Sequence, residues 1–271
     1  MKTLTIISEN LDCGGTEKVI IKLIRYYENK GYKTNILLLS KAKVFKRFII
    51  PSNTSIKELN RLKSNNFFSK IFNIFWLILQ LRKYIYSNKE SKYISFLTIP
   101  IIFTIISSFN LDILHLASER INPKKVNLSI HWKLARFLLY RNLSKLVVQT
   151  SEIAKIYKKF VPKNKIKIIP NSVDSVLFKK PLTFNYSKPL KLLFIGRLEY
   201  QKGLDILIYA LKIISEEYKN LQFFVEIVGS GNLYDFVNDS INNFSLKDWV
   251  TLQPMSSEPI QNILKADIIL H

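Results

Sequence analysis

The chain has 271 residues, of which 48% are hydrophobic and 23% charged, and it carries a formal net charge of +21 and a single cysteine, Cys13. This length suits about two domains, and one cysteine excludes an internal disulfide framework and fits a reducing compartment. Residues 1–172 hold 31 Lys and Arg against 9 Asp and Glu, whereas residues 173–271 hold 10 against 11. Codon bias alone does not explain why the excess of basic residues is confined to the first part, so we expect an anionic partner for residues 1–172.

The N-terminal run Thr3–Ser8 is partly alternating and apolar, which predicts a β-strand. It is too short for the core of a signal peptide and lacks a small-residue cleavage site, so we expect a cytoplasmic protein. A helix is predicted over Glu17–Lys30 with Gly31 at its C-cap, and a second strand over Thr34–Leu39.

Two apolar stretches follow, Ile71–Leu81 and Ile94–Phe109. Both fall short of the ~20 apolar residues that a membrane-spanning helix requires. A core helix is the favoured interpretation of the first stretch. Its flanking cations, Lys70, Arg82 and Lys83, leave open a helix that lies in a membrane interface.

The remaining pattern alternates strands with helices, which predicts an α/β fold of doubly wound parallel sheets. A hinge-like run at 166–174 separates an expected domain 1–172 from an expected domain 173–271. Strands are expected at Tyr93–Leu97, Asp112–Leu116, Leu146–Gln149, Leu190–Ile195, Phe223–Val228, Val250–Leu252 and Ile268–Leu270. Helices are expected at Ser151–Phe160, with Ser151 as the N-cap, at Gly203–Tyr218 and at Leu233–Phe244.

The first strand-to-helix loop carries Gly14, Gly15, Thr16 and Glu17. Paired glycines let the backbone approach a ligand closely, and a helix N-terminus attracts anions. The pattern is not GxGxxG, so bound NAD is not expected. A tight turn with Thr16 or Glu17 capping a helix explains the same residues equally well.

A second cluster, Gly196-Arg197 with Lys202, also lies where a strand leads into a helix. An arginine fork and a lysine charge at that edge suit a diphosphate. Arg197 is the only arginine in residues 173–271, which favours a function over the alternative of two solvated surface cations. A third turn, with Gly229 and Gly231, is by itself ordinary for this position.

These motifs, in this order, resemble the GT4 glycosyltransferases, a retaining family with the GT-B fold. The resemblance implies two Rossmann-like domains that face a cleft, an N-terminal acceptor domain and a C-terminal domain for the nucleotide sugar. It further implies that Arg197 and Lys202 hold the donor diphosphate and act in catalysis, with Gly14, Gly15, Thr16, Glu17, Gly196, Gly229 and Gly231 in substrate binding and neither a metal nor another cofactor. The matching segments are Gly14-Gly15-Thr16-Glu17, Ile168–Asp174, Gly196-Arg197-Leu198, Gln201-Lys202-Gly203, Val228-Gly229-Ser230-Gly231 and Lys265-Ala266-Asp267-Ile268, with Ser172 where the family usually has glycine.

The segments Phe96-Leu97-Thr98 and Ser118–Pro123 resemble a branch of the family that adds N-acetylhexosamines to undecaprenyl-diphosphate glycans. This resemblance implies a UDP-sugar donor, a lipid-linked or polysaccharide acceptor, and substrate binding by Glu119 and Arg120. Many relatives outside this branch carry a histidine in this region, but we interpret His115 as a core residue.

The second domain has only 99 residues, whereas a complete domain of this kind is expected nearer 150. The acidic pair Glu-x7-Glu of the family belongs after the strand at 268–270, beyond the last residue of this sequence. An alternative hypothesis is therefore a truncated, inactive relative that at most binds nucleotide.

The basic first domain has two candidate partners. Nucleic acid is disfavoured, because no zinc pattern, basic zipper or RNA-binding aromatic motif is present. The second is the anionic inner face of the plasma membrane, where each Lys or Arg contributes about 1 kcal/mol and attachment is reversed by salt. The apolar stretch around Phe75 and Trp76 would deepen this attachment if its face is exposed.

Overall fold

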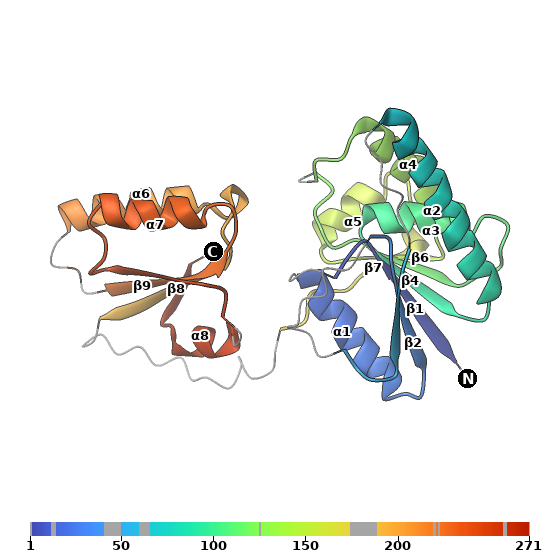
Figure 1. Ribbon diagram of the computed structural model, residues 1–271, viewed down its shortest axis with the longest axis horizontal. Helices are drawn as coiled ribbons and strands as arrows, with labels where there is room; N and C mark the ends of the chain where they lie inside the picture. The colour runs from blue at the N-terminus through green and yellow to red at the C-terminus, as the bar shows by residue number, and fades with distance from the viewer. Residues whose placement is uncertain are drawn as a thin grey trace. The chain divides into compact units, whose positions relative to one another are not determined.

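The computed structural model describes residues 2–11, 15–40, 50–59, 66–124, 126–173, 189–218, 221, 223–256 and 259–270. The chain divides into two compact units, Met1–Asn171 and Ser172–His271 (Figure 1). We describe each unit by itself, as unit 1 and unit 2.

Unit 1 is built on a sheet of seven described strands, all parallel, in the order β3-β2-β1-β4-β5-β6-β7. The strand order reverses between β1 and β4, which makes this pair the switch point of the sheet. The strands are β1 Thr3–Ser8, β2 Lys33–Leu38, β3 Thr54–Glu58, β4 Lys92–Phe96, β5 His115–Ser118, β6 Lys145–Val148 and β7 Ile166–Ile168.

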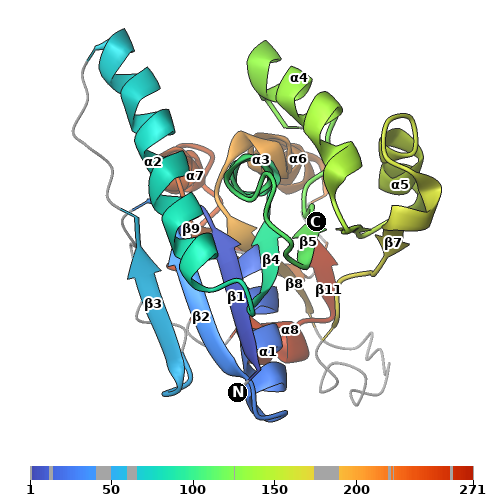
Figure 2. The ribbon, with the colours of Figure 1, turned by 90° about the vertical axis from the view of Figure 1, so that its right-hand side faces the viewer.

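Helices cover both faces of this sheet (Figure 2). In β1, Ile6 packs with α1 on one face and Ile7 packs with α2 and α3 on the other, as alternating side chains require. Because both faces are covered, every residue of β1 and β2 except the first of each strand is buried, polar side chains included. The helices are α1 Gly15–Glu28, α2 Phe67–Ser87, α3 Thr98–Ser107, α4 Ile130–Leu139 and α5 Ser151–Tyr157, with short 3-10 turns η1 Tyr140–Asn142 and η2 Lys163–Lys165.

Unit 2 has four described strands, also parallel, in the order β10-β9-β8-β11. The order reverses between β8 and β11, and helices α6 and α7 cover one face while α8 covers the other (Figure 1). The predicted α/β fold of parallel sheets is therefore confirmed. The elements are β8 Leu190–Arg197, η4 Tyr200–Lys202, α6 Leu204–Glu217, β9 Phe223–Ser230, α7 Tyr234–Asn243, β10 Val250–Gln253, α8 Pro259–Lys265 and β11 Ile268–Leu270.

Two local predictions are wrong. The strand expected at Asp112–Leu116 occupies His115–Ser118 instead. The N-cap of α5 is Thr150 and not Ser151, because the Thr150 hydroxyl accepts a 3.2 Å hydrogen bond from the Ile153 amide while Ser151 is already helical.

The favoured interpretation of Ile71–Leu81 as a core helix holds for only one face of α2. Leu77, Leu81 and Ile85 are buried against the sheet. The opposite face is apolar and exposed, so the core interpretation is wrong for it. Among the described helices, none combines the length and the hydropathy needed to cross a bilayer.

Candidate active site

The carboxyl ends of the parallel strands are the edges at which open α/β sheets bind ligands, above all at a switch point. In unit 1, the loops after β1 and β4 flank this position, and in unit 2 the loop after β8 does so. The predicted site residues that the structure describes lie at these strand ends, in these loops or in the strand ends and loops next to them.

In unit 2, Gly196 and Arg197 end β8 and pair with Gly229 and Ser230 of β9. The Arg197 side chain is 61% exposed, and its Nη1 lies 3.3 Å from Glu199 Oε1. An exposed ion pair of this kind contributes at most about 1 kcal/mol, so it leaves the guanidinium available to an anion.

Lys202 lies five residues further along the same loop, at the end of η4. It is exposed and makes no ion pair within the described part of the chain. Gly203 follows with φ +67° as the N-cap residue of α6, so the loop turns directly into a helix N-terminus. The loop thus presents two cations and a helix start at the carboxyl edge of β8, an arrangement suited to a phosphate or diphosphate.

The three glycines of this edge differ in what surrounds them. A Cβ at Gly229 would lie 2.1 Å from the Gly196 carbonyl oxygen, and one at Gly231, where φ is +155°, would lie 2.4 Å from the Leu198 carbonyl oxygen. A Cβ at Gly196 would meet nothing within 4 Å. Gly229 and Gly231 are therefore required for the close packing of the β8 and β9 ends, whereas Gly196 borders open space.

In unit 1, the loop after β1 contains the first predicted cluster. Gly14 lies outside the described residues. Gly15 begins α1 with nothing within 4 Å of a Cβ position, Thr16 is half-buried, and Glu17 is only 8% exposed. Gly15 is therefore the described residue of this cluster that leaves room for a ligand.

Glu119 lies directly after β5 and is 2% exposed. Its Oε1 accepts hydrogen bonds from Thr98 Oγ1 at 2.7 Å and from the Tyr140 hydroxyl at 2.5 Å. Burial raises the pKa of this carboxyl, while hydrogen bonds from Tyr140 and Thr98 and the charge of Arg136 act in the opposite direction. The carboxyl faces protein partners, so the geometry favours a positioning role for Glu119 over direct contact with substrate.

Arg120 is the neighbouring residue and is half-buried. Its Nη2 donates a hydrogen bond to Asn171 Oδ1, at the last residue of unit 1. Arg120 therefore links the loop after β5 to the segment that leads out of the unit.

His115 is 5% exposed and lies at the amino end of β5, far along the strand from the carboxyl edge. Its Nε2 is 2.5 Å from Ser95 Oγ, and burial lowers the pKa of the imidazole to about 3. The residue is a core histidine, as its position in a predicted strand indicated.

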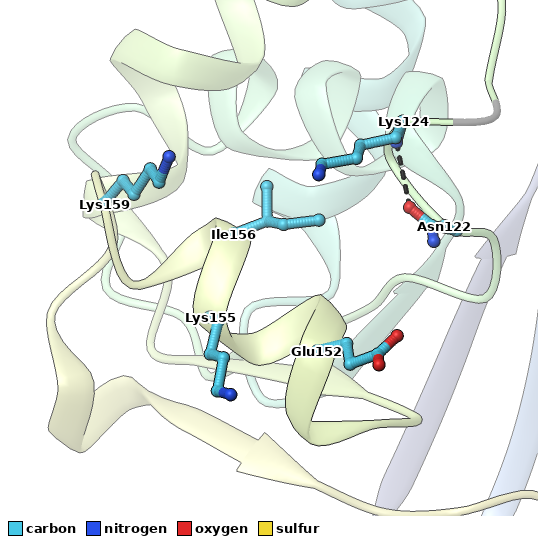
Figure 3. A pocket seen from close by; sticks show the side chains of 6 residues that line it. All are labelled: Asn122, Lys124, Glu152, Lys155, Ile156 and Lys159. Carbon is cyan, nitrogen blue, oxygen red and sulfur yellow. Dashed lines mark hydrogen bonds between the residues drawn. The ribbon is translucent and has the colours of Figure 1, made fainter.

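A pocket of about 480 Å³ beside α5 is a feature that the sequence reasoning missed (Figure 3). Figure 3 shows the Lys124 side chain reaching toward Ile156, with Lys159 beyond it and Lys155 turned away. The spacing of Lys155 and Lys159, four residues apart on a predicted helix, was the available signal. The lining residues are Asn122, Lys124, Glu152, Lys155, Ile156 and Lys159.

Across the described residues, no group of three or more His, Cys, Asp or Glu side chains is placed to hold a metal ion. Independently of this, the exposed cations Arg197 and Lys202 beside the start of α6 are groups that can stabilise an anion.

Comparison with known proteins identifies related sequences and folds. Residues 178–271 match the model of a family described as glycosyl transferases group 1. A Campylobacter jejuni protein, GalNAc-alpha-(1->4)-GalNAc-alpha-(1->3)-diNAcBac-PP-undecaprenol alpha-1,4-N-acetyl-D-galactosaminyltransferase, is 25% identical over 250 residues, which cover 91% of this chain and 67% of that protein.

Solved structures show the same fold at low sequence identity. Anabaena HepE in complex with UDP is 15% identical with a TM-score of 0.73, and the match covers 99% of this chain and 73% of that one. Sucrose-phosphate synthase from Thermosynechococcus elongatus is 12% identical with a TM-score of 0.72, over 97% of this chain and 73% of that one.

Proposed function

We propose a function from the premise that residues 178–271 match the glycosyl transferases group 1 family and that the chain has the GT-B fold. The proposed reaction transfers a hexosyl or N-acetylhexosaminyl unit from a UDP-sugar to a lipid-linked or polysaccharide acceptor, with retention. The observation that carries the proposal is the position of Arg197 and Lys202 at the end of β8, the switch-point strand of the matched unit. The similarity to a transferase named for an undecaprenol-diphosphate glycan supports a lipid-linked acceptor.

On the donor side, Arg197 and Lys202 bind the diphosphate of the UDP-sugar. When the bond between the anomeric carbon and the phosphate oxygen breaks, negative charge develops on the departing UDP. Cations already in place stabilise that charge without reorganising. The acceptor hydroxyl oxygen forms the new glycosidic bond as the bond to UDP breaks, and its proton passes to the departing phosphate oxygen of UDP.

On the acceptor side, the exposed Gly15 at the start of α1 and the lysine pocket beside α5 supply contacts for an anionic acceptor. Lys124 and Lys159 are matched to a lipid-linked diphosphate by charge. Exchanging both for Gln is expected to raise the KM for a diphosphate-linked acceptor several-fold and to leave the KM for the UDP-sugar unchanged. An unchanged KM for the acceptor would show that the pocket beside α5 is not part of the acceptor-binding site.

The proposed acceptor also indicates where in the cell the protein acts. We place the protein in the cytoplasm, peripheral to the inner face of the plasma membrane, because its basic residues 1–172 meet anionic lipid and its acceptor is anchored there. Lys and Arg near an anionic surface each contribute about 1 kcal/mol, so a few contacts are sufficient for reversible attachment.

Calorimetry with UDP, followed by a turnover assay with a panel of UDP-sugars and a prenyl-diphosphate glycan, tests the proposal. UDP binding together with a new glycan product is the expected result. Binding without any product would favour the alternative, an inactive relative that at most binds nucleotide. Absence of binding would contradict the donor site itself.

A further inference from the structure

The outward face of α2 is apolar although it faces solvent. Eight of the large hydrophobic side chains described on this helix are exposed, between 38% and 83%. Most of them lie on the side away from the stripe of Leu77, Leu81 and Ile85 that packs on the sheet, so the helix is apolar on two faces. Ile74 instead continues the line of that stripe toward the N-terminus of the helix. The exposed residues are Phe68, Ile71, Phe72, Ile74, Phe75, Trp76, Leu79 and Tyr86.

Helix α4 also exposes large apolar side chains to solvent, but fewer of them. None of its residues is fully buried, and Ile130, Leu134, Phe137 and Leu138 are 47–79% exposed. Their spacing of four, three and one residues places them on one side of the helix. An apolar patch of this extent is unusual for a surface that meets only water.

The two helices lie on either side of α3, and both contact it. Figure 2 shows their ends rising beyond the carboxyl edge of the sheet, the edge at which the loops after β1, β4 and β5 lie. Apart from Tyr86, the exposed side chains lie in the N-terminal two thirds of α2, whereas the buried stripe continues toward its C-terminal end. The apolar surfaces thus border the edge that carries the unit 1 site residues.

Along the sequence, the segments that contain the two helices are rich in cations. Residues 59–89, which include α2, contain six Lys and Arg and no Asp or Glu, and residues 120–151, which include α4, contain seven and none. Apolar side chains in segments rich in cations are complementary to a surface that is apolar inside and anionic outside. That surface is a bilayer with anionic lipid.

We propose that the outward faces of α2 and α4 insert into the interface of an anionic bilayer and turn the carboxyl edge of unit 1 toward it. This inference rests on the proposed function, whose lipid-linked acceptor would then present its diphosphate at that edge. Insertion adds an apolar contribution to the attachment by lysines, so part of the binding survives high salt. Charge alone would be screened within about 8 Å at physiological ionic strength.

Sedimentation of the full chain with vesicles of phosphatidylglycerol and phosphatidylcholine tests the apolar contribution. The triple exchange of Phe68, Phe72 and Phe75 to Ser is expected to weaken binding at least about tenfold and to abolish the salt-resistant part. The matched control exchanges Ile206 and Ile213, which are 72% and 52% exposed on α6 of unit 2, to Ser and is expected to bind like the native chain. Equal binding by all three proteins would overturn the proposal.

Fluorescence of Trp76 gives a second readout that does not depend on the triple variant. The sequence contains three tryptophans, so exchanging Trp132 and Trp249 to Phe leaves Trp76 as the sole tryptophan of the variant. Brominated acyl chains are expected to quench it and anionic vesicles to shift its emission to the blue. Unchanged emission would overturn the proposal, as would a stable dimer in solution whose formation requires Phe68, Phe72 and Phe75.

Both readouts use vesicles without donor or acceptor, so they separate this inference from glycosyl transfer. If the protein binds vesicles through α2 but makes no product, the membrane-docking inference is supported and the proposed function is contradicted. If the protein makes product but does not bind vesicles, the proposed function is supported and the membrane-docking inference is contradicted.

Discussion

The Thr98 hydroxyl donates a 2.7 Å hydrogen bond to the buried carboxyl of Glu119, which joins the start of α3 to the loop after β5. Tyr140 donates to the same carboxyl oxygen from η1. Leu97, just before Thr98, has φ +69°, a costly conformation for a residue with a branched side chain. The bonds to Glu119 therefore hold together three segments, one of which leaves β4 at the switch point.

Exchanging Glu119 to Ala is expected to lower the free energy of unfolding by about 1–3 kcal/mol, because two buried hydroxyls lose their acceptor. Glu119→Gln keeps an acceptor oxygen and is expected to cost less. Urea unfolding of the native chain and both variants measures this difference. Equal stability of the Ala and Gln variants would show that the hydrogen bonds do not hold the segments together.

His115 predicts an acid-sensitive contribution to stability. Its pKa is about 3 in the folded chain against an ordinary 6.5, so the unfolded chain takes up the proton first as pH falls. The contribution is complete above pH 6.5 and is lost between pH 6.5 and about 3, with a slope of about 1.4 kcal/mol per pH unit.

Comparing unfolding curves across this range isolates the effect. His115→Gln is expected to flatten the pH dependence relative to the native chain, whereas His131→Gln, an exchange on the exposed surface of α4, is expected to leave it intact. A His115→Gln variant with the native slope would contradict a buried, neutral imidazole.

Two glycines at the end of β8 and β9 form a matched pair. Gly229→Ala is expected to destabilise unit 2 by more than 1 kcal/mol, because its Cβ would lie 2.1 Å from the Gly196 carbonyl oxygen. Gly196→Ala is expected to leave stability nearly unchanged, since no atom lies within 4 Å of that Cβ, but to weaken UDP binding. Thermal unfolding and calorimetry separate the two effects, and a reversed order would contradict the packing described at this edge.

Sequence reasoning located strands that contain a run of apolar residues. β1 at Thr3–Ser8 and β11 at Ile268–Leu270 have the predicted bounds. It missed β3, Thr54–Glu58, because this strand is nearly all exposed and shows no apolar pattern. Exposure is also why α2 was misjudged, since periodicity cannot tell which of two apolar faces meets the core.

The candidate site was partly accessible from sequence for a different reason. Glycines and cations after strands mark the carboxyl edge, so Gly196, Arg197 and Lys202 could be selected from spacing alone. What spacing could not give is the orientation of each side chain. Glu119 is turned into the protein, while Gly229 and Gly231 serve local packing.

The central claim is that Arg197 holds the diphosphate of a UDP-sugar during glycosyl transfer, and the most direct measurement is product formation by Arg197 variants. The native chain is incubated with UDP-N-acetylgalactosamine and a prenyl-diphosphate glycan, and mass spectrometry measures the added N-acetylhexosamine. We expect product from the native chain, a reduced rate from Arg197→Lys, which keeps the charge but loses the bidentate fork, and the lowest rate from Arg197→Ala. Equal rates for the native chain and Arg197→Ala would contradict the account and make Arg197 a surface cation.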